Sequence, residues 1–107
     1  MNIEISPKEY ERKLNWHDGM LYCQLLTIDN KNDWRLPTKD ELNDVYDTKN
    51  DIYHSENDFV RAYYWSSTEY DDNCAWGQYF QPNGNQFNHG KKTISFYVRT
   101  VRTIEPS

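Results

Sequence analysis

The periodicity of the apolar residues changes once along this chain, and that change constrains the fold more than any other feature. Before residue 50, apolar side chains recur at spacings of three and four, as in Trp16, Met20 and Cys23, which is typical of an amphipathic helix. After residue 63 they occur in short runs bounded by Asn, Gly and Asp, which is typical of strands and turns. Helices followed by several short strands predict an α+β fold with a β-meander.

The sequence predicts two helix starts. Asn15 is expected to cap the first helix, because a short polar side chain there can accept a backbone N–H of the first turn. Thr38 and Glu41 have the three-residue spacing of a capping box, which predicts the start of the second helix. Apolar residues at helical spacing then predict the buried side of that helix, namely Leu42, Val45 and Tyr46.

The remaining elements are predicted to be short. Ser6 and Pro7 have the residue types of an N-cap and a first helical position, so a brief helical turn is expected there. Strands are expected at residues 2–5, 63–68, 75–80 and 93–101. The last is the strongest, with one face made of Ile94, Phe96, Val98 and Thr100. Turns are expected at Pro82–Asn85 and at His89–Lys92.

Aromatic side chains supply much of the apolar material. Only 20 of the 107 residues are Leu, Ile, Val or Phe, whereas the chain carries four Trp and nine Tyr. Disordered chains are poor in aromatic residues, so we expect a compact core built largely from rings, with enough Tyr left to cover a surface. The length suits one domain spanning residues 1–107.

The charge is acidic and unevenly distributed. The formal net charge is −5, which excludes a generally basic nucleic-acid-binding surface, and we expect no direct nucleic-acid contact. Ten acidic and two basic residues lie in Asp40–Asp72, against one acidic and four basic residues in Gly90–Ser107. The acidic segment is either a solvated helix face or a patch that attracts a basic protein surface or mimics DNA phosphates.

The start of the chain gives an expectation about location. Met1–Ile5 has neither the positive region nor the apolar region of a secretory signal, and no apolar stretch is long enough to span a membrane. We therefore expect no membrane association and a location in the cytoplasm of a host cell or in a virion.

Cysteine and histidine patterns argue against a metal centre. Cys23 and Cys74 are too few for a four-cysteine zinc site, so they are two thiols or, in an oxidising compartment, one bridge. His17 lies six residues before Cys23, which is not helical adjacency, so no catalytic thiolate is expected. The three histidines are scattered without ligand spacing.

Two acidic loops are candidate calcium sites. The loop Asp29–Asp33 has alternating polar residues, but Trp34 stands where an EF-hand loop requires Gly. Asp71–Asn73 places oxygen ligands close together and leaves a loop calcium site open as an alternative. We expect no metal ion and no cofactor.

Three sequence blocks occur in an order that resembles a known family. Trp16 and Leu21-Tyr22-Cys23 are followed by Asp33-Trp34-Arg35-Leu36-Pro37-Thr38 with Glu41-Leu42, by Tyr64-Trp65-Ser66-Ser67-Thr68-Glu69 with Ala75-Trp76, and by Tyr97-Val98-Arg99-Thr100-Val101-Arg102. Over residues 14 to 103 the chain resembles the DUF1566 family, also called the Lcl C-terminal domain. The resemblance implies a C-type-lectin-like fold, in which two helices pack on a twisted antiparallel sheet with irregular loops. It also implies kinship with phage receptor-binding proteins and formylglycine-generating enzymes.

The chain departs from its relatives where chemistry is concerned. Many members carry Cys at the position of Thr100, which the resemblance implies is bridged to the position of Cys23; the loss of that pair suits a reducing compartment. The formylglycine-generating relatives need a close cysteine pair, which is missing, so we expect no enzyme activity. Gln81-Pro82-Asn83 is similar to the sugar motif of calcium-dependent lectins, but the accompanying Trp-Asn-Asp segment is absent.

The blocks that resemble the family are expected to have mainly structural roles. We expect Trp34 and Leu36 to anchor a loop on the core, and Arg35 to pair with a carboxylate or a carbonyl. Trp65 and Trp76 are predicted to be core rings. Arg99 and Arg102 are three residues apart in a predicted strand and so face opposite sides, which predicts one buried and one surface guanidinium.

A binding surface is predicted where Tyr and Asn are concentrated, because antibody paratopes use these residues as adaptable contacts. Its candidate residues are Tyr70, Asp71, Asp72, Tyr79, Gln81, Asn83, Asn85, Phe87, Asn88 and His89. We expect a non-enzymatic protein of phage or mobile-element type that binds, and inhibits, a protein partner such as a host enzyme. The alternative is a virion or surface adhesin domain that recognises a glycan or receptor. No catalytic residue is predicted, and the oligomeric state stays open.

Overall fold

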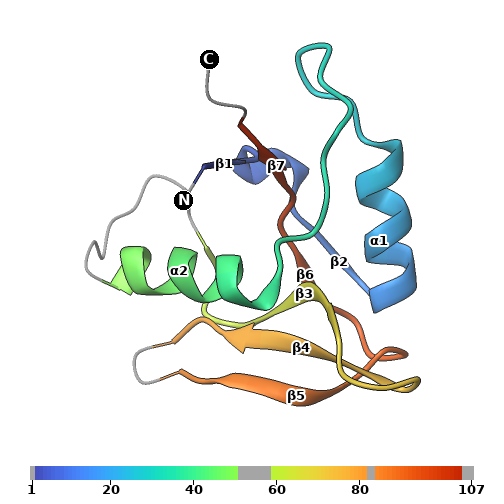
Figure 1. Ribbon diagram of the computed structural model, residues 1–107, viewed down its shortest axis with the longest axis vertical. Helices are drawn as coiled ribbons and strands as arrows, with labels where there is room; N and C mark the ends of the chain where they lie inside the picture. The colour runs from blue at the N-terminus through green and yellow to red at the C-terminus, as the bar shows by residue number, and fades with distance from the viewer. Residues whose placement is uncertain (1, 51–58, 82–83, 105–107) are drawn as a thin grey trace.

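The computed structural model describes residues 2–50, 59–81 and 84–104 and confirms the α+β class (Figure 1). Its elements, in chain order, are β1 (Ile3–Ile5), the 3₁₀ turn η1 (Lys8–Tyr10), β2 (Arg12–Leu14), α1 (Trp16–Leu25), α2 (Lys39–Asn50), β3 (Tyr63–Glu69), β4 (Cys74–Tyr79), β5 (Gln86–Lys91), β6 (Phe96–Val98) and β7 (Val101–Thr103).

The strands form two sheets. The larger has the order β2-β6-β3-β4-β5, so β5 lies at one edge and β2 at the other. The smaller is an antiparallel pair of β1 and β7, which brings the two ends of the chain to the same region (Figure 1). Within the larger sheet β3 and β6 are parallel, through Tyr64 and Tyr97, so the sheet is mostly antiparallel instead of wholly so as the resemblance implied.

Both predicted helix caps are confirmed. The Asn15 side chain accepts the backbone N–H of Asp18 at 2.8 Å. The Thr38 hydroxyl accepts the N–H of Glu41 at 3.2 Å, and the Glu41 carboxylate accepts the N–H of Thr38 at 2.9 Å, which is a complete capping box. Both helix starts are therefore determined by local sequence.

The predicted Ser6 cap is wrong. The turn is a short 3₁₀ segment that begins at Lys8, with Pro7 before it and no capping side chain. Ser6 is instead fully buried, and its backbone N–H donates to the Thr100 carbonyl at 3.0 Å. This long-range hydrogen bond holds Ser6 in the protein interior. A local sequence pattern does not predict it.

The larger sheet separates two apolar clusters. Alternate residues of a strand point to opposite faces, so the neighbours Tyr64 and Trp65 belong to different clusters. Trp65 packs with side chains of α1 and with others in a cluster of Trp16, Cys23, Leu36, Trp65, Ala75 and Val98. Tyr64 packs with the predicted stripe of α2 in a cluster of Leu42, Val45, Tyr46, Tyr64 and Phe80. Each face of the sheet therefore has its own helix.

The predicted strand 93–101 is wrong as a single element. It is divided into β6 and β7, which belong to different sheets. At the division, Arg99 Nε donates to the Ser6 carbonyl at 2.8 Å, and Val101 exchanges two backbone hydrogen bonds with Arg35, each 2.8 Å long. These partners lie far away in sequence and draw the chain out of the larger sheet. Ile94, predicted to share one strand face with Phe96, Val98 and Thr100, is 45% exposed.

The predicted turn at His89–Lys92 is also wrong, because β5 continues to Lys91 and the turn follows it, closed by the Ile94 N–H on the Lys91 carbonyl at 2.9 Å. Gly90 suggested a turn, but here its lack of a side chain makes room for neighbouring rings to pack. A Cβ there would lie 2.9 Å from both the Trp65 and the Phe87 rings. The predicted turn at 82–85 lies partly outside the described residues.

Most structural roles expected of the family blocks are confirmed, with one correction. Trp34 and Leu36 are buried. Arg99 is also buried, whereas Arg102 is half-buried and pairs with Asp33; the two arginines do not share a strand, because Arg99 lies between β6 and β7. The correction concerns Trp76, which is half-buried and belongs to neither core cluster. It lies on the α2 side of the sheet, where the Lys39 ammonium is 4.5 Å from its ring centroid and the Tyr70 ring meets it edge-on.

Arg35 has the carboxylate partner that was one of its two expected types. Its two terminal nitrogens donate to the two oxygens of Glu41 at 2.6 and 2.9 Å, in addition to the capping box. This hydrogen-bonded pair lowers the pKa of Glu41 and raises that of Arg35. The charged pair thus fixes the Arg35-Leu36-Pro37 segment against the start of α2.

Candidate functional site

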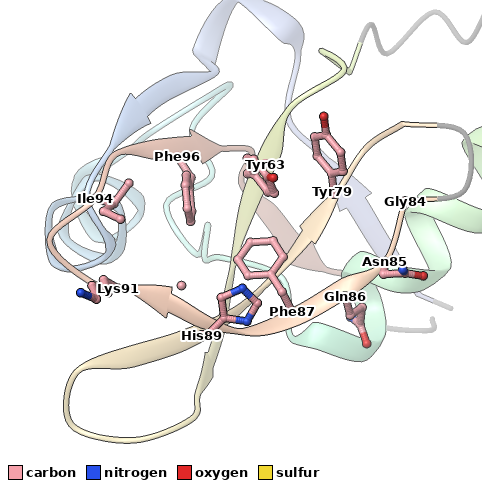
Figure 2. Close-up of a pocket in the computed structure, with 11 residues that line it drawn as sticks. Tyr63, Tyr79, Gly84, Asn85, Gln86, Phe87, His89, Lys91, Ile94 and Phe96 are labelled. Carbon is pink, nitrogen blue, oxygen red and sulfur yellow. The ribbon is translucent and has the colours of Figure 1, made fainter.

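A groove of about 450 Å³ opens on one face of the larger sheet, beyond the part that α1 covers (Figure 2). We call it the aromatic groove. Its lining residues are Tyr63, Tyr79, Gly84, Asn85, Gln86, Phe87, His89, Gly90, Lys91, Ile94 and Phe96. Four neighbouring strands each contribute an aromatic ring to it, because Tyr63, Tyr79, Phe87 and Phe96 come from β3, β4, β5 and β6.

The rings of the groove form one continuous cluster. Tyr63 and Tyr79 are directly paired across β3 and β4, and their rings stack with centroids 4.3 Å apart. The Tyr63 ring also meets Phe87 edge-on at 5.2 Å, and Phe87 meets Phe96 edge-on at 5.7 Å. Phe96 in turn lies 4.5 Å from Trp65 of the core. The groove is therefore anchored to the core while Tyr63 remains 42% exposed.

Two glycines allow Phe87 to lie against the sheet. Gly77 is paired with Phe87 across β4 and β5, and a Cβ at Gly77 would lie 2.5 Å from the Phe87 ring and 2.7 Å from the Tyr64 carbonyl oxygen. A Cβ at Gly90 would likewise lie 2.9 Å from the Phe87 ring, as described above. Since real side chains do not approach that closely, both positions require glycine for this ring placement.

Among the described residues that line the groove, the one charged side chain is the basic Lys91. Lys91 is exposed at one end of the groove and Asn85 stands at the other end, while His89, also exposed, lies between them beside the Phe87 ring (Figure 2). The described lining contains no carboxylate, and Lys91 has no ion-pair partner among the described residues. The next residue, Lys92, is different: it is buried, and its ammonium lies 2.6 Å from the Glu69 carboxylate.

The structure brings together only part of the predicted surface. Four of the ten predicted residues line the groove, namely Tyr79, Asn85, Phe87 and His89. Asn83 lies outside the described residues. Gln81 does not line the groove, and its side-chain amide donates to the Arg61 carbonyl at 3.5 Å. Asn88 is half-buried and does not line the groove either.

The other three predicted residues lie in the turn between β3 and β4. There the Asp71 carboxylate accepts the backbone N–H groups of Asn73 and Cys74 at 2.8 and 2.7 Å, so it shapes the turn. Tyr70 is 55% exposed and Asp72 is also exposed, but neither lines the groove. The predicted surface is thus two separate regions.

Sequence reasoning missed several of the residues that complete the groove. Tyr63 and Phe96 were assigned only to strands, and Gly90 and Lys91 to a turn. The pairing that brings these residues together is long-range, so no local pattern marked them. The one available signal was an isolated Gly inside a predicted strand, Gly77, which suggests that another group approaches closely.

Several carboxylates of the acidic segment, Asp40–Asp72, have structural roles. Glu41, Glu69 and Asp71 are engaged by Arg35, Lys92 and the β3–β4 turn. Asp40, Asp44 and Asp47 recur at helical spacing on α2 and are exposed, so they form a solvated acidic stripe. The acids at positions 51, 56 and 58 lie outside the described residues.

Both cysteines are free thiols in this structure. Cys23 is buried in the cluster beneath α1, and this burial raises its pKa to about 12. Cys74 is half-buried at the start of β4. In the described ranges, no three His, Cys, Asp or Glu side chains are arranged to hold a metal ion, and no helix has the length and apolar content needed to cross a membrane.

The fold defines a small α+β domain in which two helices flank a mostly antiparallel sheet. The chain belongs to the Lcl C-terminal domain family, whose sequence model matches residues 4–102. This match confirms the family suggested by the sequence blocks. Comparison with curated proteins gave no match.

Proposed function

We propose that this chain is a non-enzymatic binding protein and that the aromatic groove holds a protein partner. The observation that carries the proposal is the ring cluster, which is anchored to the core through Phe96 and Trp65 and yet leaves Tyr63 42% exposed. Preorganised aromatic rings supply a large contact area at a low cost in conformational entropy, and they are enriched in binding hot spots.

The composition of the groove supports binding over catalysis. Its described lining offers the imidazole of His89 and the ammonium of Lys91, together with amides and phenol rings. General acid–base or nucleophilic catalysis needs a positioned pair, such as a base beside a hydroxyl, a thiol or a second acid. The lining gives His89 no such partner, which favours a binding role.

Our proposal for the partner is a host protein, such as an enzyme that this chain inhibits. It rests on the family resemblance to small phage and mobile-element proteins with a C-type-lectin-like fold. The protein would then act in the host cytoplasm or as part of a virion. The exposed acidic stripe of Asp40, Asp44 and Asp47 is the competing interface for a basic partner.

A second candidate is a glycan-binding adhesin domain. It is favoured by one observation, the stacked pair of Tyr63 and Tyr79, with the amide of Asn85 at the same groove. Flat aromatic surfaces with nearby amides can pack against the apolar face of a sugar ring and bond its hydroxyls. A glycan array with and without calcium tests this candidate.

The test of the protein-binding proposal is affinity capture from the cytosol of the cells that carry the protein. Wild type is compared with Tyr79→Ala in the groove, Asp44→Asn in the acidic stripe, and Leu25→Ala as a control. Leu25 is 74% exposed on α1, so its truncation removes exposed apolar area elsewhere. We expect one stoichiometric partner that Tyr79→Ala loses and both other variants retain.

Salt distinguishes the two interfaces. A partner held by rings resists a high-salt wash, whereas one held by exposed carboxylates is released, because salt screens exposed charges. A partner lost in Asp44→Asn and at high salt, but retained by Tyr79→Ala, would contradict the groove and point to the acidic stripe. Binding to an array glycan without any captured protein would contradict a protein partner altogether.

A further inference from the structure

The aromatic groove runs beside an open edge of the larger sheet. The strand β5 pairs with β4 on one side and, among the described residues, with no strand on its other side (Figure 1). Five of the eleven lining residues come from β5 itself, namely Gln86, Phe87, His89, Gly90 and Lys91. An edge strand presents unpaired backbone N–H and C=O groups, which can pair with an added strand. Backbone partners and side-chain pockets thus lie next to each other.

This combination suits one form of peptide recognition. In β-strand addition, backbone hydrogen bonds to an edge strand supply affinity, and adjacent pockets that receive alternate side chains supply specificity. Here the apolar contact is the Phe87 ring, flanked by Tyr63 and near Phe96. An apolar side chain of an added strand can reach these rings while its backbone stays at the β5 edge.

The charge at the groove selects the type of peptide. Lys91 is exposed at one end, and no carboxylate of the described residues pairs with it. The protein as a whole carries a net charge of −5, so this basic end differs in sign from the chain as a whole. A carboxylate on the partner beside Lys91 gives charge complementarity, whereas a second cation would be repelled.

We infer that the occupant of the aromatic groove is a short extended segment of the protein partner, which pairs with the free edge of β5, places an apolar side chain on Phe87 and carries Asp or Glu toward Lys91. The inference rests on the proposed function and specifies the partner segment. The segment is short because β5 contains a register shift opposite Ala75–Gly77, which breaks the regular edge.

The first experiment selects ligands directly, so the natural partner need not be identified beforehand. A random 12-residue peptide display library is panned against wild-type protein, with Tyr79→Ala protein used for counter-selection. We expect enriched sequences in which apolar or β-branched residues alternate with polar ones and include Asp or Glu. Enrichment of Lys- and Arg-rich sequences, or of helical patterns with apolar residues three and four apart, would overturn the inference.

The second experiment tests the binding mode with the best synthetic peptide. Methylation of its backbone nitrogens, one position at a time, removes a donor from each in turn. We expect dissociation constants at least about tenfold weaker at alternate positions and nearly unchanged at those between, because only one edge of an added strand faces β5. Uniform tolerance of N-methylation would overturn strand addition.

Charge reversal tests the basic end. Lys91→Glu is expected to weaken the peptide about three- to tenfold, since an attractive exposed pair becomes repulsive. The matched control is Lys13→Glu, which makes the same change in net charge on β2 at the opposite edge. Equal effects of the two variants would overturn the role of Lys91.

The failures can be told apart. If Tyr79→Ala loses the captured natural partner but no alternating acidic peptide is enriched, the groove binds protein and the extended-segment inference is wrong. If the natural partner is indifferent to Tyr79→Ala, the proposed function fails as well.

Discussion

One face of the larger sheet has two ends that use the same kind of side chain in opposite ways. At the end beneath α1, Trp65 is fully buried, and its indole N–H donates to the Leu14 carbonyl at 3.1 Å. At the other end, Tyr63 lies two residues earlier in the same strand and is 42% exposed. The covered end and the open end are joined through Phe96, which contacts both rings.

The difference lies in what covers each ring. The covered end has the Trp16 ring of α1 and the buried Cys23 thiol within its cluster, whereas at the open end no residue of α1 or α2 is among the described residues that line the groove. An aromatic ring in a strand therefore belongs to the core where a helix covers it and to the surface where none does. The number of rings alone does not tell which of them stabilise the fold and which are available for binding. We assign stability to the covered end and propose that the open end contacts the partner.

The largest predicted effect falls on the covered end. Trp65→Ala is expected to lower the free energy of unfolding by about 3–5 kcal/mol, because it removes a fully buried ring and leaves a cavity. Tyr63→Ala, the matched change at the open end, is expected to cost about 1 kcal/mol or less. Urea denaturation measures both. Equal losses would show that the two ends are not distinct.

The next largest effect is expected from a change that fills the space beside Gly77, against which the Phe87 ring packs. Gly77→Ala places a Cβ 2.5 Å from the Phe87 ring and 2.7 Å from the backbone oxygen of Tyr64, so a shift is unavoidable. We expect a loss of about 1–3 kcal/mol in urea denaturation and displaced ring resonances of Phe87 in NMR spectra. Thr93→Ala, in the exposed turn after β5, serves as the control. Unchanged Phe87 ring resonances in the variant would contradict the close approach of Phe87 to Gly77.

A smaller effect on stability is expected at the stacked tyrosines. Tyr79→Ala removes the partner of Tyr63, whose ring centroid lies 4.3 Å away, and partly exposed aromatic pairs of this kind contribute only about 0.5–1 kcal/mol. The thermal midpoint should therefore fall by a few degrees while the far-UV spectrum is unchanged. A loss as large as that of Trp65→Ala would place Tyr79 in the core.

A further prediction concerns the reactivity of the buried thiol, and it requires the smallest change in structure. Burial raises the pKa of Cys23 to about 12, so at pH 8 its thiolate is scarce and shielded. An aromatic disulfide reagent should label Cys23 at least about 100-fold more slowly than unfolded protein, and Cys74→Ser leaves the slow thiol alone for this measurement. Fast labelling of native Cys23 would mean that α1 does not cover that end.

The same pKa shift gives a pH dependence with a definite sign. A thiol whose folded pKa is raised binds its proton more tightly in the native state. Its contribution to stability is fully present below the unfolded pKa, about 8.5, and is lost as pH rises toward the folded pKa of about 12. Cys23→Ala should flatten the decline in stability between these values.

Local chemistry made some of the fold predictable. The capping box of Thr38 and Glu41 and the cap at Asn15 involve residues within three positions, so the sequence alone predicts both helix starts. The strands of the β-meander that begin near Tyr63 and Cys74 were also found, because their β-prone runs are flanked by turn residues.

Long-range pairing made the rest unpredictable. The division of β6 from β7 depends on Ser6 and Arg35, which lie more than 60 residues away. The aromatic groove depends on four strands meeting in one register, so Tyr79 and Phe87 were predicted from their residue types while Tyr63 and Phe96 were not. Trp76 was assigned to the core because ring type alone does not reveal that a ring will lie half-buried outside the core clusters, between Lys39 and Tyr70.

Site-specific photo-crosslinking tests the central claim most directly. A benzophenone side chain is introduced in place of Tyr79 at the open end or, as the control, in place of Leu25, which is 74% exposed on α1. Each protein is irradiated in the cytosol of the cells that carry it. We predict one discrete adduct from position 79, competed away by unlabelled wild type and absent from position 25. An adduct formed at position 25 alone would contradict the assignment of binding to the open end.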